Sequence, residues 1–173
     1  MTGDLEATVR ELADRAAIHD VLMRYFRGVD RLDLELVRSC YHPDATDAHG
    51  SFTGGVEEFI GWVGPLLASY DSTFHFAGNL LIEFDSEQLA FAELYGIAHH
   101  RTAGGRREQN LITGFRFVDR FERRDGGAWL IARRRALTEW VRVDDPEDWF
   151  EFSARLASGR RDGLDPVFDR STE

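Results

Sequence analysis

The chain has 173 residues, a formal net charge of −10 and a sequence pI near 5.1. A chain of this length is expected to form one domain with one core, and its acidic balance argues against partners such as nucleic acids or anionic membranes. All 21 basic residues are arginines, so the absence of lysine excludes Schiff-base chemistry and a lysine general base.

The N-terminal sequence MTGDLE lacks the charged and apolar regions of a signal peptide. No run approaches the roughly 18 apolar residues of a membrane-spanning helix. The single cysteine, Cys40, cannot form an internal disulfide and lies in an apolar helix pattern. These features predict a cytoplasmic protein without a membrane partner.

Apolar residues recur every three or four positions between residues 5 and 29, which predicts a first helix. Tyr25 lies on its apolar stripe, and Gly28 is expected to mark its end. Asp30 then falls near the C-terminus of the helix. Because the helix dipole disfavours a negative charge there, a cationic or donor partner for Asp30 becomes more valuable.

A short helix capped by Asp33 is expected to extend through residue 40. Residues 44–52 are predicted to form a short strand. The sequence Thr53-Gly54-Gly55 then opens a third helix, whose apolar side includes Trp62.

From residue 72 onward the apolar period changes from 3.6 to 2. Four long strands separated by hairpin-type turns are predicted at approximately 72–84, 88–101, 107–124 and 128–142. After them, an acidic cap and a proline predict a C-terminal helix that reaches about residue 158. Residues 159–173 are expected to form a loosely held tail.

Helices followed by a long meander predict an α+β domain, in which helices cover one face of a curved antiparallel sheet. The sheet and the N-terminal helices are expected to enclose a cone-shaped apolar cavity, which is the default ligand site. No repeat or linker divides the chain. Residues 1–173 are therefore predicted to form a single domain, with its core at about 8–150.

His75 is the residue on which the functional prediction depends. It alternates with Thr73 and Ala77 on one face of an apolar strand pattern, and a buried histidine needs a partner for its ring N–H. We expect Asp30 to be that partner, because a carboxylate that orients an imidazole raises its basicity and favours proton abstraction. The alternatives are a hydrogen-bonded core histidine and a surface aspartate at a helix end.

The segments around these two residues resemble the nuclear transport factor two-like superfamily, in its branch of polyketide-cyclase-like (SnoaL-like) lyases. The similar stretches are residues 12–18, 28–30 and 73–79, within a resemblance that covers about residues 8–150. This branch includes hexachlorocyclohexane dehydrochlorinases, scytalone dehydratases and bile-acid dehydratases. The resemblance implies a catalytic dyad of His75 and Asp30 that works without a cofactor.

The same resemblance implies further site residues. The tyrosine, aspartate and histidine of bile-acid dehydratases fall on Tyr25, Asp30 and His75, so Tyr25 is expected to polarise a substrate carbonyl. A second active-site histidine of scytalone dehydratases falls on His100. The active-site arginine of the dehydrochlorinases falls on Arg134. Tyr25 as a plain core residue and His100 at a solvent rim remain open alternatives.

Strand alternation adds substrate-binding candidates. Alternation places Arg134 on the same side of its strand as Trp140, with small residues between them. This pattern suits a cavity wall in which Arg134 binds an oxyanion or a substrate carboxylate. The alternative is a strand face exposed to solvent. Asn79 is expected on the His75 face, and Trp62 is expected to line the pocket. Phe117 falls where scytalone dehydratases have an asparagine that holds the substrate, so the resemblance implies that Phe117 lies at the substrate. No short ligand spacing supports a metal site.

The predicted function is a cofactor-independent lyase of the dehydratase type that acts on a hydrophobic cyclic, polyketide-like or steroid-like substrate. An isomerase or cyclase that uses the same dyad is one alternative. A non-catalytic ligand-binding module, or a small subunit of an oxygenase, is the other. The long sheet offers a face for self-association, so a homo-oligomer, a trimer or dimer, is expected.

Overall fold

The computed structural model describes residues 2–102, 110–145 and 158–169. Its elements are α1 (Thr2–Arg31), α2 (Leu34–Arg38), β1 (Tyr41–His49), β2 (Phe52–Gly55), α3 (Val56–Ala68), β3 (Ser72–Ser86), β4 (Leu89–Arg101), β5 (Leu111–Arg123), β6 (Trp129–Val143) and the 3-10 helix η3 (Pro166–Phe168). No helix within these ranges combines the length and apolar character that a membrane span requires.

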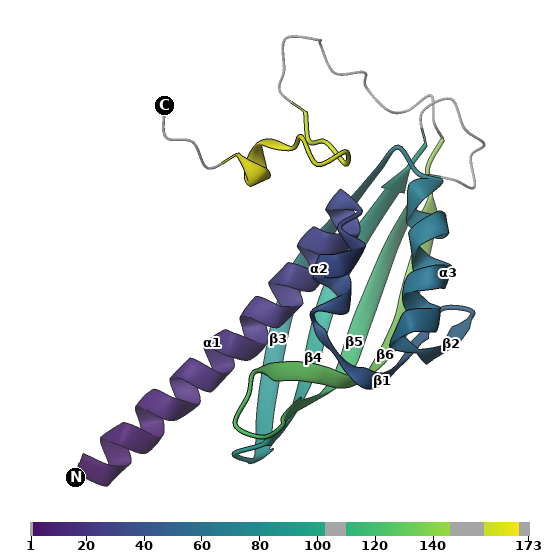
Figure 1. Ribbon diagram of the computed structural model, residues 1–173. Coiled ribbons are helices and arrows are strands. Elements are labelled where there is room, and N and C mark those ends of the chain that lie inside the picture. Colours follow the sequence, from purple (N-terminus) through teal and green to yellow (C-terminus); the bar gives the residue numbers. More distant parts are fainter. Residues whose placement is uncertain (1, 103–109, 146–157, 170–173) are drawn as a thin grey trace.

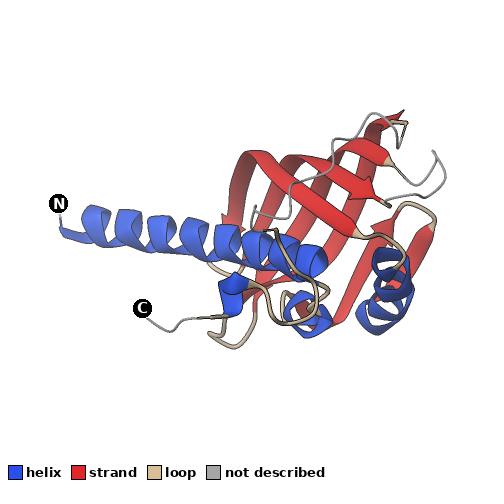
Figure 2. Ribbon diagram, turned by 90° about the horizontal axis from the view of Figure 1, so that it is seen from above, coloured by secondary structure: helices blue, strands red, loops and turns tan. Residues whose placement is uncertain are grey.

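The six strands form one curved, unclosed sheet in the order β2-β1-β6-β5-β4-β3. Strands β3 to β6 form the predicted antiparallel meander. Strand β1 pairs in parallel with β6, so the complete sheet is mixed. Helix α1 runs along the sheet on the side of β3, and α3 lies near β1 and β2 (Figures 1 and 2). This arrangement confirms the predicted α+β fold class.

Helix α1 joins the core through the half that lies over the sheet. Its buried stripe has the predicted spacing of three and four residues and consists of Ile18, Val21, Leu22, Tyr25, Phe26 and Val29. The N-terminal turns project beyond the sheet (Figure 2). Leu12, which continues the apolar spacing toward the N-terminus, is 61% exposed. The core is therefore built between the C-terminal half of α1 and the concave sheet face.

Helix α1 ends later than Gly28, contrary to the sequence prediction. Leu32 adopts a left-handed φ of 56°, and the backbone N–H of Asp33 donates to the carbonyl of Gly28 at 2.9 Å, which is a Schellman closure. Gly28 instead allows α2 to approach, because a Cβ there would lie 2.6 Å from Cγ2 of Val37. Asp30 thus sits in the last turn of a helix whose end is fixed.

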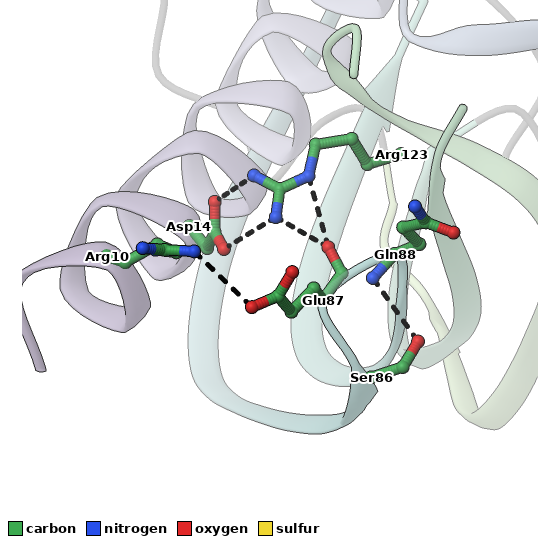
Figure 3. Close-up of polar contacts among 6 residues, drawn as sticks. All are labelled: Arg10, Asp14, Ser86, Glu87, Gln88 and Arg123. Atoms are coloured by element: carbon green, nitrogen blue, oxygen red, sulfur yellow. Dashed lines mark hydrogen bonds and ion pairs between the residues drawn. The ribbon is translucent and has the colours of Figure 1, made fainter. Parts of the chain in front are cut away.

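At the opposite end of the sheet, Arg123 ties α1 to the strands (Figure 3). Its Nη1 and Nη2 donate to the two carboxylate oxygens of Asp14 at 2.6 and 3.1 Å, and its Nε donates to the carbonyl of Glu87 at 3.1 Å. Arg10 adds an ion pair with Glu87 at 3.3 Å. One side chain of β5 therefore fixes both the helix and the β3–β4 turn.

The C-terminal predictions have two outcomes. The expected helix reaching residue 158 falls on residues 146–157, outside the described residues. Of the tail expected at residues 159–173, the structure describes residues 159–169, and these contact α1 and Tyr70. Asp165 pairs with Arg31 of α1 at 3.2 Å, and Arg161 donates to the carbonyl of Tyr70 at 2.6 Å.

Candidate functional site

A cavity of about 290 Å³ lies between the concave sheet face and the helices. Most of its wall is apolar, and three histidines and two tyrosines interrupt that wall. The lining residues are Tyr25, Val29, His49, Gly50, Trp62, Val63, Leu66, Leu67, Tyr70, His75, Ala98, His100, Leu111, Thr113, Phe115, Phe117, Ala136, Leu137 and Thr138. A mainly apolar pocket with a few polar groups is the usual form of a small-molecule site.

The structure brings Asp30 and His75 together at the wall of this cavity. His75 Nδ1 lies 2.7 Å from Asp30 Oδ1, and the backbone N–H of His75 donates to Asp30 Oδ2 at 3.0 Å. The hydroxyl of Thr73 donates to Asp30 Oδ1 at 3.0 Å. Both carboxylate oxygens are engaged, so the Asp30 side chain holds the His75 ring in one orientation.

Aromatic rings complete the setting of His75. Its ring stacks on Phe26 with centroids 5.7 Å apart, and the edge of His100 approaches it at 5.5 Å. The side chains of His75 and Asp30 are only 11% and 15% exposed. With Nδ1 held against Asp30, Nε2 is the ring nitrogen that a bound molecule would reach.

His100 lies in the same cavity, as the resemblance implied. Its ring packs 4.9 Å from that of Tyr70, and its Nδ1 is buried without a hydrogen-bond partner among the described residues. Burial, together with the nearby His75, lowers the pKa of His100 to about 4. His100 is therefore neutral at neutral pH and provides a polar but uncharged contact.

This lowered pKa predicts a specific acid sensitivity. Between pH 6.5 and about 4 the unfolded chain binds a proton at His100 that the folded protein does not, so the stability present above pH 6.5 is lost as the pH falls. The expected loss at pH 5 is about 2 kcal/mol. Urea unfolding at pH 7 and pH 5 measures it. His100→Gln should remove this part of the loss and His99→Gln should not; equal losses in all three proteins would contradict the prediction.

Tyr25, Phe117 and Trp62 also line the cavity, in agreement with the expected positions. Burial raises the pKa of Tyr25 well above its ordinary value, so its hydroxyl keeps its proton. Phe117 is 2% exposed, and the ring of Trp62 stacks on Phe52 at 5.4 Å. These three aromatic side chains give the pocket a rigid wall.

Arg134 does not line the cavity, and its predicted role in binding a substrate anion is corrected. The side chain is fully buried, and its Nε and Nη2 donate to the two carboxylate oxygens of Asp119 at 2.8 and 2.6 Å. The guanidinium lies 4.2 Å from the ring centroid of Tyr25 and 3.9 Å from that of Phe117. Because Nε and Nη2 are both engaged by Asp119, the guanidinium is not available to bind a substrate anion. Arg134 instead packs behind the Tyr25 and Phe117 rings of the cavity wall.

Asn79 and Trp140 lie on the other side of the sheet, contrary to the predicted alternation. Both line a groove with Phe76 rather than the cavity. Two β-bulges explain the difference. One lies in β3 between Ala77 and Leu80, and the other lies in β6, where Gly114 pairs with Trp140 but Phe115 pairs with Thr138. Each bulge inserts an extra residue, which changes the face of the sheet on which the side chains at and after it lie. Neither residue is adjacent to His75 in space.

Sequence analysis missed His49, Tyr70 and the carboxylates beneath the cavity. Asp119 and Asp47 are each 1% exposed, and Asp47 accepts a hydrogen bond from the hydroxyl of Tyr41 at 2.7 Å. A polar residue on the inward face of a strand was the available indication for Asp119. The described residues contain no group of three or more metal-ligating side chains.

Comparison with known proteins identifies the family. The family model of the SnoaL-like domain matches residues 10–135. The chain belongs to the SnoaL-like domain family. This finding confirms the resemblance seen in the sequence, and both Asp30 and His75 lie within the matched residues.

Solved structures share the SnoaL-like fold. LinA is 25% identical with a TM-score of 0.73, and the match covers 84% of this chain and 97% of LinA. The hexachlorocyclohexane dehydrochlorinase LinA-type3 from Novosphingobium barchaimii is 22% identical, with a TM-score of 0.72 and coverage of 84% and 98%. A protein named as a candidate scytalone dehydratase from Novosphingobium aromaticivorans is 22% identical, with a TM-score of 0.70 and coverage of 83% and 99%. An uncharacterized Mycobacterium bovis protein is 25% identical over 130 residues, which are 73% of this chain and 86% of that protein.

Proposed function

We propose that this SnoaL-like protein is a cofactor-independent lyase of the dehydratase type. His75 takes a proton from the carbon beside a substrate carbonyl, while Asp30 orients the ring and stabilises the imidazolium. The carbon–carbon double bond then forms, the carbon–oxygen bond breaks with its electron pair on oxygen, and that oxygen takes a proton from a general acid and leaves as water. The observation that carries the proposal is the 2.7 Å contact between His75 Nδ1 and Asp30 at the wall of an apolar cavity. Tyr25, whose hydroxyl stays protonated, is the proposed group that polarises the carbonyl.

The cavity supports a hydrophobic cyclic substrate. Aliphatic and aromatic side chains make up most of its wall, so a substrate gains binding free energy by leaving water. Its volume of about 290 Å³ is at the lower end of the range for ligand pockets, about 300–1,000 Å³. This size favours a ring system of one or two rings, of the polyketide-like kind, over a four-ring steroid.

Self-association is part of the proposal. The face of the sheet opposite the cavity exposes large aromatic side chains, among them Phe74 at 60%, Phe76 at 59% and Trp140 at 48%. Such a patch is typical of a contact between subunits. Sedimentation velocity of the wild type and of Phe76→Ser tests the expected dimer or trimer, and a monomeric wild type would contradict it.

Ring titration by NMR tests the proposed dyad without a known substrate. We compare the wild type with Asp30→Asn and use His75→Gln to assign the signal. Asp30→Asn should change the titration of His75 and leave that of His99, on the neighbouring strand β4, unchanged. A His75 titration that ignores Asp30→Asn would contradict the proposed dyad.

Product mass then defines the reaction. A panel of cyclic β-hydroxyketones is incubated with the protein and analysed by mass spectrometry. Loss of water is the expected result. A product of unchanged mass would indicate the isomerase or cyclase alternative, and binding without turnover would indicate a ligand-binding module.

A further inference from the structure

A second histidine–aspartate pair faces the same cavity from strand β1. His49 Nδ1 and Asp47 Oδ1 lie 3.6 Å apart, just beyond hydrogen-bond distance. Both atoms are buried, and neither has a hydrogen-bond partner among the described residues. The ring of His49 lines the cavity and stacks on Phe59 at 5.6 Å. The pair places a second histidine beside a buried carboxylate on a different wall of the cavity, without the hydrogen bond that joins His75 to Asp30.

Sheet register explains why the pair is buried. Asp47 of β1 lies opposite Arg134 of β6, and Arg134 lies opposite Asp119 of β5, so an aspartate occupies the register position on each side of Arg134. One row further along, His49 lies opposite Ala136, which lies opposite Phe117. The small Ala136 side chain lets His49 reach the cavity, where its ring meets that of Phe117 at 5.6 Å.

The carboxylate of Asp47 has few polar partners in this row. The side chains of Asp47, Asp119 and Arg134 are 0%, 1% and 0% exposed, so all three lie away from water. Arg134 is committed to Asp119, and Tyr41 donates a hydrogen bond to Oδ2 of Asp47. The ring of His49 is the polar group that lies beside the other oxygen, Oδ1.

The geometry points to His49 as a second catalytic residue, a general acid that protonates the leaving hydroxyl while His75 acts as the base. This assignment rests on the proposed dehydratase function. His75 takes the proton from carbon, the carbon–carbon double bond forms, and the carbon–oxygen bond breaks with its electron pair on oxygen. That oxygen takes the proton from His49 and leaves as water. Proton exchange with solvent then restores His49 and His75.

Two probes that differ only in the leaving group test this role. Elimination from 3-hydroxycyclohexanone needs an acid, whereas 3-(4-nitrophenoxy)cyclohexanone releases a stable phenolate and needs none; both give the same enone. His49→Gln should lower turnover of the hydroxy probe by about 10²-fold or more and change the nitrophenoxy probe by less than about threefold. His75→Gln should lower both. Equal losses on both probes in His49→Gln would overturn the assignment. Failure of the proposed lyase function is distinguishable, because the wild type would then turn over neither probe.

Discussion

Replacing His75 with alanine is expected to lower turnover by about two to four orders of magnitude, the usual contribution of a general base. Asp30→Asn should have an effect of the same order, because an amide neither stabilises the imidazolium nor holds the ring tautomer as the carboxylate does. Both effects should fall on kcat more than on KM, since the proton moves only in the chemical step. Steady-state kinetics on the first active probe measure them.

The neighbouring strand position supplies the control. His99 is adjacent to His100 on β4, and its ring contacts Phe74 on the sheet face that points away from the cavity. His99→Ala should therefore keep wild-type kinetics. Circular dichroism and urea unfolding establish that each variant is folded. Wild-type turnover in a folded His75→Ala protein would refute the proposed mechanism.

Replacing Arg134 with methionine is expected to lower the free energy of unfolding by about 3–5 kcal/mol. The guanidinium and Asp119 form a bidentate pair with side-chain exposures of 0% and 1%, so the substitution leaves a carboxylate buried without its counter-charge. Methionine keeps much of the volume between the Tyr25 and Phe117 rings. Urea unfolding at pH 7 measures the loss.

Two matched variants separate charge from packing. Arg116→Met breaks ion pairs with Glu93 and Glu139 on the other sheet face, where all partners are more than a quarter exposed, and should cost no more than about 1 kcal/mol. The double variant Arg134→Met/Asp119→Leu should regain most of the lost stability, because it removes the unpaired charge. A double variant as unstable as Arg134→Met would show that packing, rather than charge, dominates.

The sequence was sufficient to predict the contact between Asp30 and His75. Its two determinants are local: the end of an amphipathic helix and the alternation of an unbroken strand. His75 precedes the first bulge of β3, so counting from the strand start gives the correct face. The same counting fails for Asn79, which lies within a bulge, and for Trp140, which follows one; no residue pattern indicated either bulge.

The role of Arg134 depended on register between strands, which a single strand does not encode. Its partner Asp119 comes from β5, and the second carboxylate of the row, Asp47, comes from β1 by parallel pairing. Alternation correctly placed Arg134 on the inward side of β6. Only the neighbouring strands determine whether an inward arginine meets a ligand or a carboxylate.

The parallel pairing of β1 with β6 has a consequence for how the chain acquires its structure during synthesis. Tyr41 pairs with Ile131, so β1 can bond only to the short β2 until almost the whole domain has left the ribosome. Pairings between segments so distant in sequence form late and slowly. The nascent chain therefore keeps the apolar residues of α1 and α3 exposed until β6 has been made, and exposed apolar surface of this kind favours aggregation.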